Sequence, residues 1–310
     1  MAGPERGILV YDVGGSHIAA AIFHRDQGNV QGVVSAGYPS EQNIDSFLGV
    51  LMSLAAKTAG GRADLQGVSL AMPGPFDYEQ GISWMKHKLD YLYGFDLRSA
   101  LAARLDLPAG GVRFLNDAAA YLTGEISAGA AQGARRVVGI TLGTGIGSAF
   151  GVDGHVIREG TGVPPGGEIW NLPYEDGILE DQISTRAIQR SYRSRSGEDR
   201  EVSTIASAAN HDPVAAGVFQ DFGRSLGTAL RAVLAPFEPE VIVLGGGISR
   251  AAQFFLDAAQ AELAALRTEL RVSSLGEIAP LVGAGAAWFE AEGGVPSTPE
   301  GAITRAVPKA

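Results

Sequence analysis

The chain has 310 residues, 45% of them hydrophobic and 19% charged, which is typical of a soluble globular protein long enough for two domains. Its formal net charge of −10 argues against binding to a nucleic-acid backbone, which requires clustered Lys and Arg. The absence of cysteine excludes disulfides and thiolate metal ligands. With no signal-like N-terminus and no apolar run of about 18 residues, we expect a cytoplasmic protein without a membrane partner.

The first half begins with an apolar strand that runs into a glycine-rich turn. Ile8-Leu9-Val10-Tyr11 precedes Asp12-Val13-Gly14-Gly15-Ser16, and a second apolar strand follows from Ala19 to Phe23. Residues 8 to about 37 are predicted to form a three-stranded meander, with its next turn at Asp26-Gln27-Gly28-Asn29. Glycine allows positive φ and close approach of the backbone to an anion, so this hairpin can offer N–H groups to a phosphate chain.

Two helices and two strands are predicted to follow, and then a third helix begins. The segments are a helix from about 44 to 59, strands at 68–72 and 112–115, and helices at 97–105 and 118–128. The strand at 68–72 ends in Pro73-Gly74-Pro75, a rigid turn in a position that is common for binding loops. Asn116-Asp117 joins the last strand to the last helix.

The second half repeats this plan. An apolar run from Val137 to Leu142 leads into Gly143-Thr144-Gly145-Ile146-Gly147, and the strand Ser148 to Val152 follows. The remaining predicted segments are strands at about 155–158 and 241–244 and helices at about 178–192, 213–234 and 250–266. The repeated plan predicts a duplicated α/β fold of the actin-like ATPase (ribonuclease H-like) class, with two domains around a cleft.

We predict domain boundaries from the same pattern. The N-terminal α/β domain should span residues 1–117 and be completed by the last helix, at about 284–293. The C-terminal α/β domain should span residues 118–283. Residues 294–310 lack apolar periodicity and are predicted to be a flexible tail.

Asp117 is the candidate catalytic residue. A carboxylate at this junction can accept the proton of a substrate hydroxyl as that hydroxyl attacks a γ-phosphate, while Asn116 orients the substrate. The alternative is that Asp117 only caps the helix that follows it.

Asp12 is the candidate Mg²⁺ residue. It directly follows a buried strand, where an uncompensated carboxylate is costly, and a hydrated Mg²⁺ ion would compensate its charge through water. A turn-stabilising role is the alternative. Gly245-Gly246-Gly247, after the apolar strand at 241–244, can form a flat floor for a nucleotide or can be an ordinary strand-to-helix turn.

With these residues in place, the chain resembles the ROK family (repressors, open reading frames and kinases) of bacterial sugar kinases over nearly its whole length. The matching segments occur in the family's order, at 12–16, 72–75, 116–119, 142–147 and 243–247. The resemblance implies that Gly74 lies in the sugar-side loop. It also implies nucleotide binding by Asp12, Gly14, Gly15, Ser16, Gly143, Thr144, Gly145, Gly245, Gly246 and Gly247.

One segment departs from the family pattern. In the family, a Gly-Glu-x-Gly-His element contributes a sugar-binding Glu and a zinc-ligating His, and a cysteine cluster precedes a second sugar-binding Glu. Here the corresponding run is Gly167-Glu168-Ile169-Trp170-Asn171, and no cysteine precedes Glu180. The resemblance therefore implies a variant without zinc, in which Asn116, Glu168, Asn171 and Glu180 hold the ring hydroxyls of the sugar.

The resemblance implies a glucokinase-like enzyme that uses ATP and Mg²⁺ to phosphorylate the primary hydroxyl of a hexose, and it implies a homodimer. Family repressors carry a helix-turn-helix domain before the first phosphate motif, and the few residues that precede the first strand here argue against DNA binding. The alternatives are a polyphosphate-dependent glucokinase, a kinase for an amino sugar or another hexose, and a non-catalytic sugar sensor. The acidic charge and the adenosine-like glycines favour ATP over polyphosphate.

Overall fold

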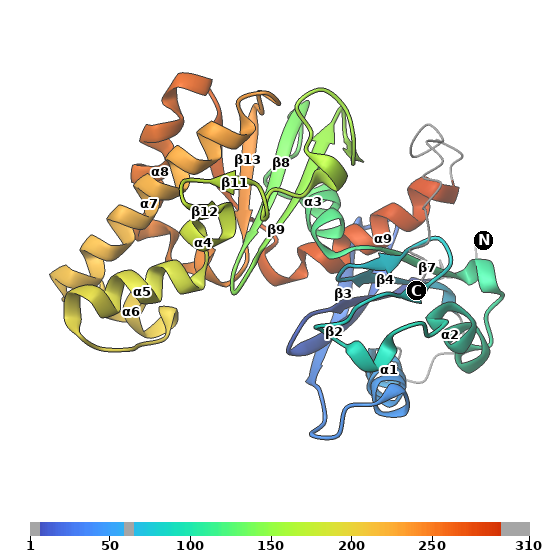
Figure 1. The fold of residues 1–310 in the computed structure, drawn as a ribbon. Helices are drawn as coiled ribbons and strands as arrows, with labels where there is room; N and C mark the ends of the chain where they lie inside the picture. Colours follow the sequence, from blue (N-terminus) through green and yellow to red (C-terminus); the bar gives the residue numbers. More distant parts are fainter. Residues whose placement is uncertain (1–6, 59–64, 293–310) are drawn as a thin grey trace, which may run out of the picture.

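The computed structural model describes residues 7–58 and 65–292, and it contains two five-stranded mixed sheets of identical topology (Figure 1). The first has the order β3-β2-β1-β4-β7, with β1 (Gly7–Val13), β2 (His17–His24), β3 (Asn29–Gly37), β4 (Leu65–Met72) and β7 (Val112–Asn116). The second has the order β10-β9-β8-β13-β14, with β8 (Arg136–Leu142), β9 (Ile146–Val152), β10 (His155–Ile157), β13 (Val241–Gly245) and β14 (Glu269–Val272). In each sheet the meander is antiparallel and the last two strands are parallel, so the predicted duplication is confirmed.

Helices cover the faces of both sheets. They are α1 (Ile44–Thr58), α2 (Leu97–Leu105), α3 (Asp117–Ala128), α4 (Leu179–Ile183), α5 (Thr185–Ser196), α6 (Val202–Ala208), α7 (Pro213–Leu234), α8 (Leu256–Leu263) and α9 (Ala279–Glu292). Two small hairpins pair β5 (Phe76–Asp77) with β6 (Ile82–Ser83) and β11 (Pro173–Tyr174) with β12 (Gly177–Ile178). Among the described residues, none of the helices has the length and apolar character needed to cross a membrane.

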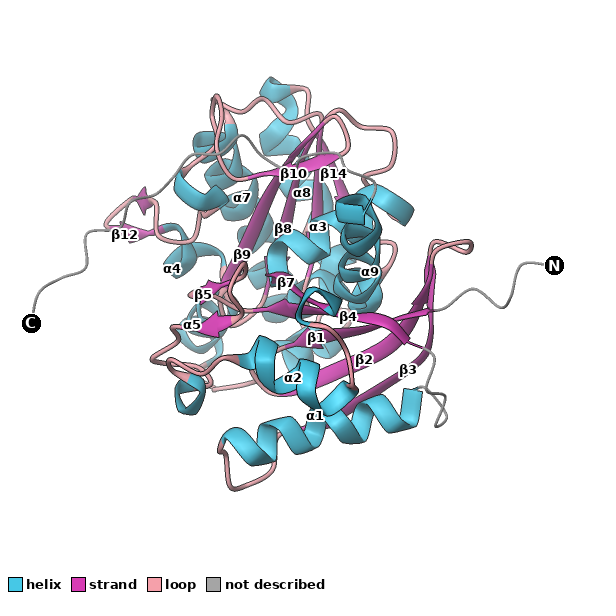
Figure 2. Ribbon diagram, turned by 90° about the vertical axis from the view of Figure 1, so that its right-hand side faces the viewer, coloured by secondary structure: helices cyan, strands magenta, loops and turns pink. Residues whose placement is uncertain are grey.

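The alternating side chains of β1 explain the layers of the first half. Leu9 and Tyr11 point into the cluster that includes Phe47 and Leu51 of α1, whereas Ile8 and Val10 point into the cluster that includes Trp288 of α9. Successive strand residues face opposite sides of a sheet, so one strand serves both layers. The C-terminal helix thus packs on the N-terminal sheet, opposite α1 and α2 (Figure 2).

Helices α3 and α9 lie side by side between the two sheets (Figure 1). Their backbones approach so closely that a Cβ at Gly283 would lie 1.8 Å from the Ala120 carbonyl oxygen, and one at Gly124 would lie 2.1 Å from that of Ala279. Only glycine fits at these two positions. The predicted boundary at residue 117 coincides with the start of α3, and the predicted tail, 294–310, lies outside the described residues.

Most predicted segments are confirmed, and α2 and α7 match to the residue. The single helix predicted at 250–266 is wrong. A 3-10 helix, Gly247–Phe254, is followed by α8, because the chain turns at Phe255, whose buried ring packs on Phe222 of α7 with centroids 5.2 Å apart. The helix predicted at 178–192 is likewise divided into α4 and α5 by Ser184, which is fully buried and extended.

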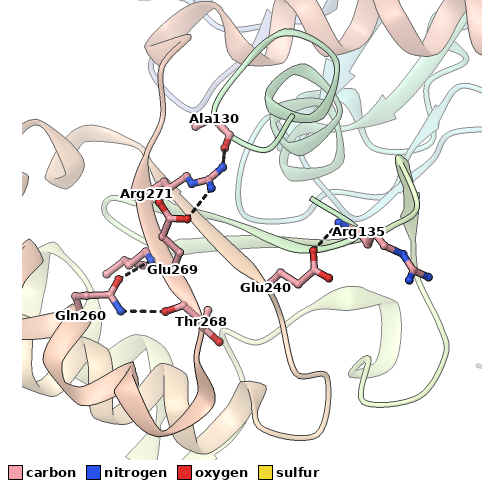
Figure 3. Close-up of polar contacts among 8 residues, drawn as sticks. Ala130, Arg135, Glu240, Gln260, Thr268, Glu269 and Arg271 are labelled. Carbon is pink, nitrogen blue, oxygen red and sulfur yellow. Dashed lines mark hydrogen bonds and ion pairs between the residues drawn. The ribbon is translucent and has the colours of Figure 1, made fainter. Parts of the chain in front are cut away.

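Strand β14 was not predicted, and Figure 3 shows how side chains hold this edge of the second sheet. Gln260 of α8 donates from Nε2 to the Thr268 carbonyl oxygen at 2.9 Å and accepts from the Leu270 N–H at 2.7 Å. Arg271 donates to the Ala130 carbonyl oxygen at 2.8 Å and pairs with Glu269 at 2.6 Å. The two contacts of Gln260 satisfy backbone groups at an edge that would otherwise be free to pair with another strand.

Candidate active site

Asn116 and Asp117 lie where β7 ends and α3 begins, and both are half-buried. Asn116 is the N-cap of α3, since its Oδ1 accepts from the Ala119 N–H at 3.1 Å. Oδ1 of Asp117 accepts from the Ala118 N–H at 2.9 Å and from Asn116 Nδ2 at 3.1 Å. The capping role therefore belongs to Asn116. Oδ2 of Asp117 receives no hydrogen bond from any other described residue, which leaves it free to accept a proton.

Asp12 is a second half-buried carboxylate, near the end of β1. Burial raises the pKa of Asp12 to about 7, and the negative charge of Asp117 adds to this rise. Burial also raises the pKa of Asp117, whereas the hydrogen bond from Ala118 and the charge of Lys88 act in the opposite direction. Within the described part of the chain, Asp12 has neither an ion pair nor a side-chain hydrogen bond. Two neighbouring carboxylates with so little compensation fit a hydrated divalent cation.

The first glycine hairpin joins β1 to β2. The Gly14 N–H donates to the His17 carbonyl oxygen at 3.0 Å, and the Tyr38 hydroxyl donates to the Gly14 carbonyl oxygen at 2.7 Å. Gly15 and Ser16 are exposed, and a Cβ at Gly15 would meet no other atom within 4 Å. The tip of this hairpin is therefore open to a ligand.

The second glycine hairpin joins β8 to β9 and is held by α4 and α5. The Thr185 N–H, at the start of α5, donates to the Gly143 carbonyl oxygen at 2.9 Å. Glu180 of α4 accepts from the Ile146 N–H at 3.0 Å and pairs with Arg186 at 2.9 Å. Both carboxylate oxygens of Glu180 thus have protein partners, and one of these partners is the hairpin itself. Its predicted role in sugar binding stays a prediction.

A cavity of about 670 Å³ opens beside the second hairpin. It is lined by Gly143 and Thr144 of the hairpin, by Thr185 of α5, by α6 and the residues next to it, and by the 3-10 helix that begins at Gly247. Polar side chains at its wall include Glu201, Ser203, Ser207, Asn210, Arg250 and Gln253. Its size and mixed lining suit a small organic ligand with an anionic end at the hairpin.

The three consecutive glycines after β13 have different roles. A Cβ at Gly245 would lie 2.6 Å from the ring of Tyr121, and one at Gly246, where φ is +81°, would lie 2.4 Å from the Leu142 carbonyl oxygen. Packing and backbone conformation therefore explain these two. Gly247 has no such neighbour within 4 Å and lines the cavity, so it alone of the three is open to a ligand.

Of the predicted acceptor residues, Gly74 lies in the loop after β4, and Glu168 is connected to that loop through its charge effect on Tyr78. A Cβ at Gly74 would lie 3.5 Å from the hydroxyl of Tyr78, a residue whose pKa responds to the charges of both Asp117 and Glu168. Glu168 is exposed and accepts from Trp170 Nε1 at 3.1 Å. Asn171 is exposed as well. Asn116, in contrast, uses its amide for contacts within the protein.

Sequence reasoning missed three residues at this site. Tyr78 contacts Asn116, the Lys88 charge acts on Asp117, and the Arg158 guanidinium lies 5.2 Å from the centroid of the Tyr78 ring. The position of Tyr78, four residues after Gly74, was the one available signal. Among residues 7–58 and 65–292, no group of three or more His, Cys, Asp or Glu side chains is arranged to hold a metal ion.

Known proteins resemble this chain over most of its length. The family model described as "ROK family" matches residues 8–291. The bifunctional enzyme NanE/NanK of Brucella melitensis is 27% identical over 91% of this chain, which spans only 54% of that protein's length. A glucokinase of Thermotoga maritima is 27% identical over 81% of this chain and 84% of its own.

A solved structure supports the fold. The ROK family glucokinase of Streptomyces griseus, in complex with glucose and AMPPNP, superposes with a TM-score of 0.76 at 23% identity, over 92% of this chain and 99% of its own. This likeness confirms the predicted actin-like ATPase fold.

Proposed function

Because this chain belongs to the ROK family, we propose that it is a hexose kinase that transfers the γ-phosphoryl group of ATP to the primary hydroxyl of a hexose, with glucose as the favoured acceptor. The observation that carries the proposal is the half-buried Asp117, which has one oxygen held by two N–H donors and the other without a donor from any other described residue. That arrangement suits a general base acting on a hydroxyl.

The roles of the residues follow from their positions. Asp117 accepts the proton of the attacking hydroxyl at Oδ2. The second hairpin, with Gly143, Thr144 and Gly145, cradles the phosphates at the mouth of the cavity, and the nucleoside lies against Gly247. Glu168 and Asn171 bind ring hydroxyls, since both are exposed and the charge of Glu168 acts on Tyr78, just after the loop that contains Gly74.

The first hairpin completes the phosphate site from the other half of the molecule. Gly15 and Ser16, at its exposed tip, offer backbone N–H groups, and Ser16 adds a hydroxyl. Asp12 would hold Mg²⁺ through water, and the bound ion supplies positive charge that neutralises the transferring phosphoryl group. Closure of the halves would exclude water, which otherwise competes as the acceptor.

A panel of acceptors and donors tests the proposal. The purified protein would be assayed with Mg²⁺ and either ATP or polyphosphate against glucose, mannose, N-acetylglucosamine and N-acetylmannosamine. We expect the highest kcat/KM with ATP and glucose, measured by coupled ADP release. A higher kcat/KM with polyphosphate, assayed by sugar phosphate formation, would replace ATP as the donor in the proposal. A higher kcat/KM with an amino sugar would replace glucose as the acceptor. Sugar binding by calorimetry without any turnover would identify a sensor and overturn it.

A further inference from the structure

Tyr78 connects two parts of the candidate site through its hydroxyl group. The residue follows β5, just after the loop that contains Gly74. Its hydroxyl donates to the Met72 carbonyl oxygen at 3.2 Å and lies 3.2 Å from Nδ2 of Asn116, from which it accepts. Burial raises the pKa of Tyr78 to about 12, so the hydroxyl keeps its proton at neutral pH and can make both bonds.

The amide of Asn116 is held at both ends. Its oxygen caps α3 at the Ala119 N–H, so its nitrogen must face the opposite way. The two hydrogens of that nitrogen have one acceptor each, the Tyr78 hydroxyl and Oδ1 of Asp117. A continuous path of hydrogen bonds therefore runs from the backbone at Met72 to one oxygen of Asp117.

We propose that Tyr78 is a positioning residue for phosphoryl transfer: its hydroxyl fixes the Asn116 amide, which holds Oδ1 of Asp117 and leaves Oδ2 directed to the acceptor hydroxyl. The inference rests on the proposed function of Asp117 as the base. A general base must lie within hydrogen-bond reach of the proton that it takes, so a small rotation of this carboxylate is costly.

The ring of Tyr78 is fixed independently of its hydroxyl. It packs on Phe76 with centroids 5.3 Å apart, and the Arg158 guanidinium covers it at 5.2 Å. Arg158 directly follows β10 of the second sheet, so the ring is contacted from both halves of the molecule. Tyr78→Phe should therefore remove the two hydroxyl contacts and keep the packing.

The kinetic test compares Tyr78→Phe with Tyr93→Phe. Tyr93 is half exposed, and its hydroxyl makes no hydrogen bond to the part of the chain that the structure describes, so it is the matched control. We expect Tyr78→Phe to lower kcat by about 10-fold, the effect of one hydrogen bond, while KM for ATP and for the sugar stay within about two-fold. The control should match the wild type. An unchanged kcat in Tyr78→Phe would overturn the inference.

A double-mutant cycle tests whether Tyr78 acts through Asn116. Asn116→Ser keeps a side-chain oxygen for the helix cap but removes the amide donors. In that background, Tyr78→Phe should change kcat by less than about two-fold. A full 10-fold loss in both backgrounds would show that Tyr78 acts independently of Asn116 and would contradict the proposed path.

A third measurement does not depend on turnover. The side-chain NH₂ signals of Asn116 would be assigned by their loss in Asn116→Ser. They would then be followed by NMR in the wild type, Tyr78→Phe and Tyr93→Phe. Exchange of these hydrogens with water should be about 10-fold faster in Tyr78→Phe than in the wild type or Tyr93→Phe. Equal exchange would overturn the inference even if the panel finds no active acceptor, whereas inactivity of the wild type alone would count against the proposed function.

Discussion

The two glycine hairpins share a sequence pattern and a place in their sheets, but they differ in what holds them. The second hairpin is tied to α5 by the Thr185 N–H and to α4 by Glu180, and it forms part of a cavity. The tip of the first hairpin is exposed, and the Tyr38 hydroxyl is its one side-chain anchor to another described element.

This difference in anchoring supports different roles for the two hairpins in the proposed reaction. A loop whose backbone is already fixed loses little freedom when it binds a phosphate, so we propose that the second hairpin is preorganised for the nucleotide. The exposed tip of the first hairpin lies in the other half of the molecule and can complete the site when the halves close. Asp117, at the start of α3, lies at the junction of the two halves.

The largest effect on kcat is expected at Asp117, the proposed general base of the reaction that both hairpins serve. Asp117→Asn should lower kcat by at least ~10²-fold, the lower range for loss of general-base help. Its melting temperature should stay within a few degrees of the wild type, because Asn116 and not Asp117 caps α3. Steady-state kinetics and thermal denaturation check both points. A parallel loss of activity and stability would instead support a structural role.

Two glutamates, Glu168 and Glu180, distinguish the sugar side of the proposed site from the ATP side. Glu168→Ala should raise KM for the sugar by roughly 10-fold, the cost of losing a charge-assisted hydrogen bond, with little change in KM for ATP. Glu180→Ala should raise KM for ATP instead, because Glu180 accepts from the second hairpin. If both variants raise KM for the sugar alone, Glu180 binds the acceptor, as the sequence predicted.

Gly245 and Gly247, two residues apart, distinguish an effect on folding from an effect on nucleotide binding. Gly245→Ala should lower the melting temperature by about 5 °C, since its Cβ would overlap the Tyr121 ring, with little change in KM for ATP. Gly247→Ala should leave stability unchanged and raise KM for ATP by roughly five-fold, because its methyl group enters the cavity. Equal effects in both variants would contradict their different roles.

Asp12, just before the first hairpin, should make the stability of the fold depend on pH. Its folded-state pKa of about 7 exceeds the unfolded value, so the ionised carboxylate destabilises the metal-free fold progressively as pH rises from 4 through 7. Asp12→Asn should therefore raise the melting temperature by roughly 2–4 °C at pH 8, the shift expected for about 1 kcal/mol, and have little effect at pH 4. Measurements in EDTA check this, and a lower melting temperature at pH 8 would refute it.

No effect is expected from removal of zinc. The chain has no cysteine, and Asn171 occupies the position of the ligating histidine in the family pattern. The segment around Asn171 is held by ordinary packing, through side chains such as the buried Ile169 and Leu179. Elemental analysis should find zinc far below one per chain, and a zinc-selective chelator in excess Mg²⁺ should leave activity intact. Inactivation that added zinc reverses would show that the loop needs the metal.

Local signals in the sequence were sufficient for most of the fold. Helix α7 was predicted to the residue because Asp212 caps it, Pro213 opens it and a long apolar face continues to Leu234. The break at Phe255 could not be foreseen, since it depends on how closely α7 approaches: a Cβ at Gly223 would lie 2.4 Å from the Phe255 carbonyl oxygen. Strand β14 is short and half-exposed, and its partner β13 lies more than twenty residues earlier.

The candidate site also contains residues that the sequence could predict and residues that it could not. The glycine turns and Asn116-Asp117 follow strands directly, so strand prediction alone placed them at strand ends. The contacts of Tyr78 with Asn116 and of Arg158 with Tyr78 join segments 38 and 80 residues apart and leave no local pattern. Glu180 shows the converse limit, because the family pattern indicates a sugar ligand whereas its described contacts lie on the second hairpin and Arg186.

The most direct test of the central claim is to follow phosphoryl transfer itself by ³¹P NMR. The purified protein would be incubated with Mg²⁺, ATP and glucose, with omission of glucose as the control. We expect the γ-phosphate signal to be replaced, one for one, by signals of ADP and of a phosphate ester on the primary hydroxyl of the sugar, only when glucose is present. Release of inorganic phosphate at the same rate with and without a sugar would contradict the assignment of this chain as a hexose kinase.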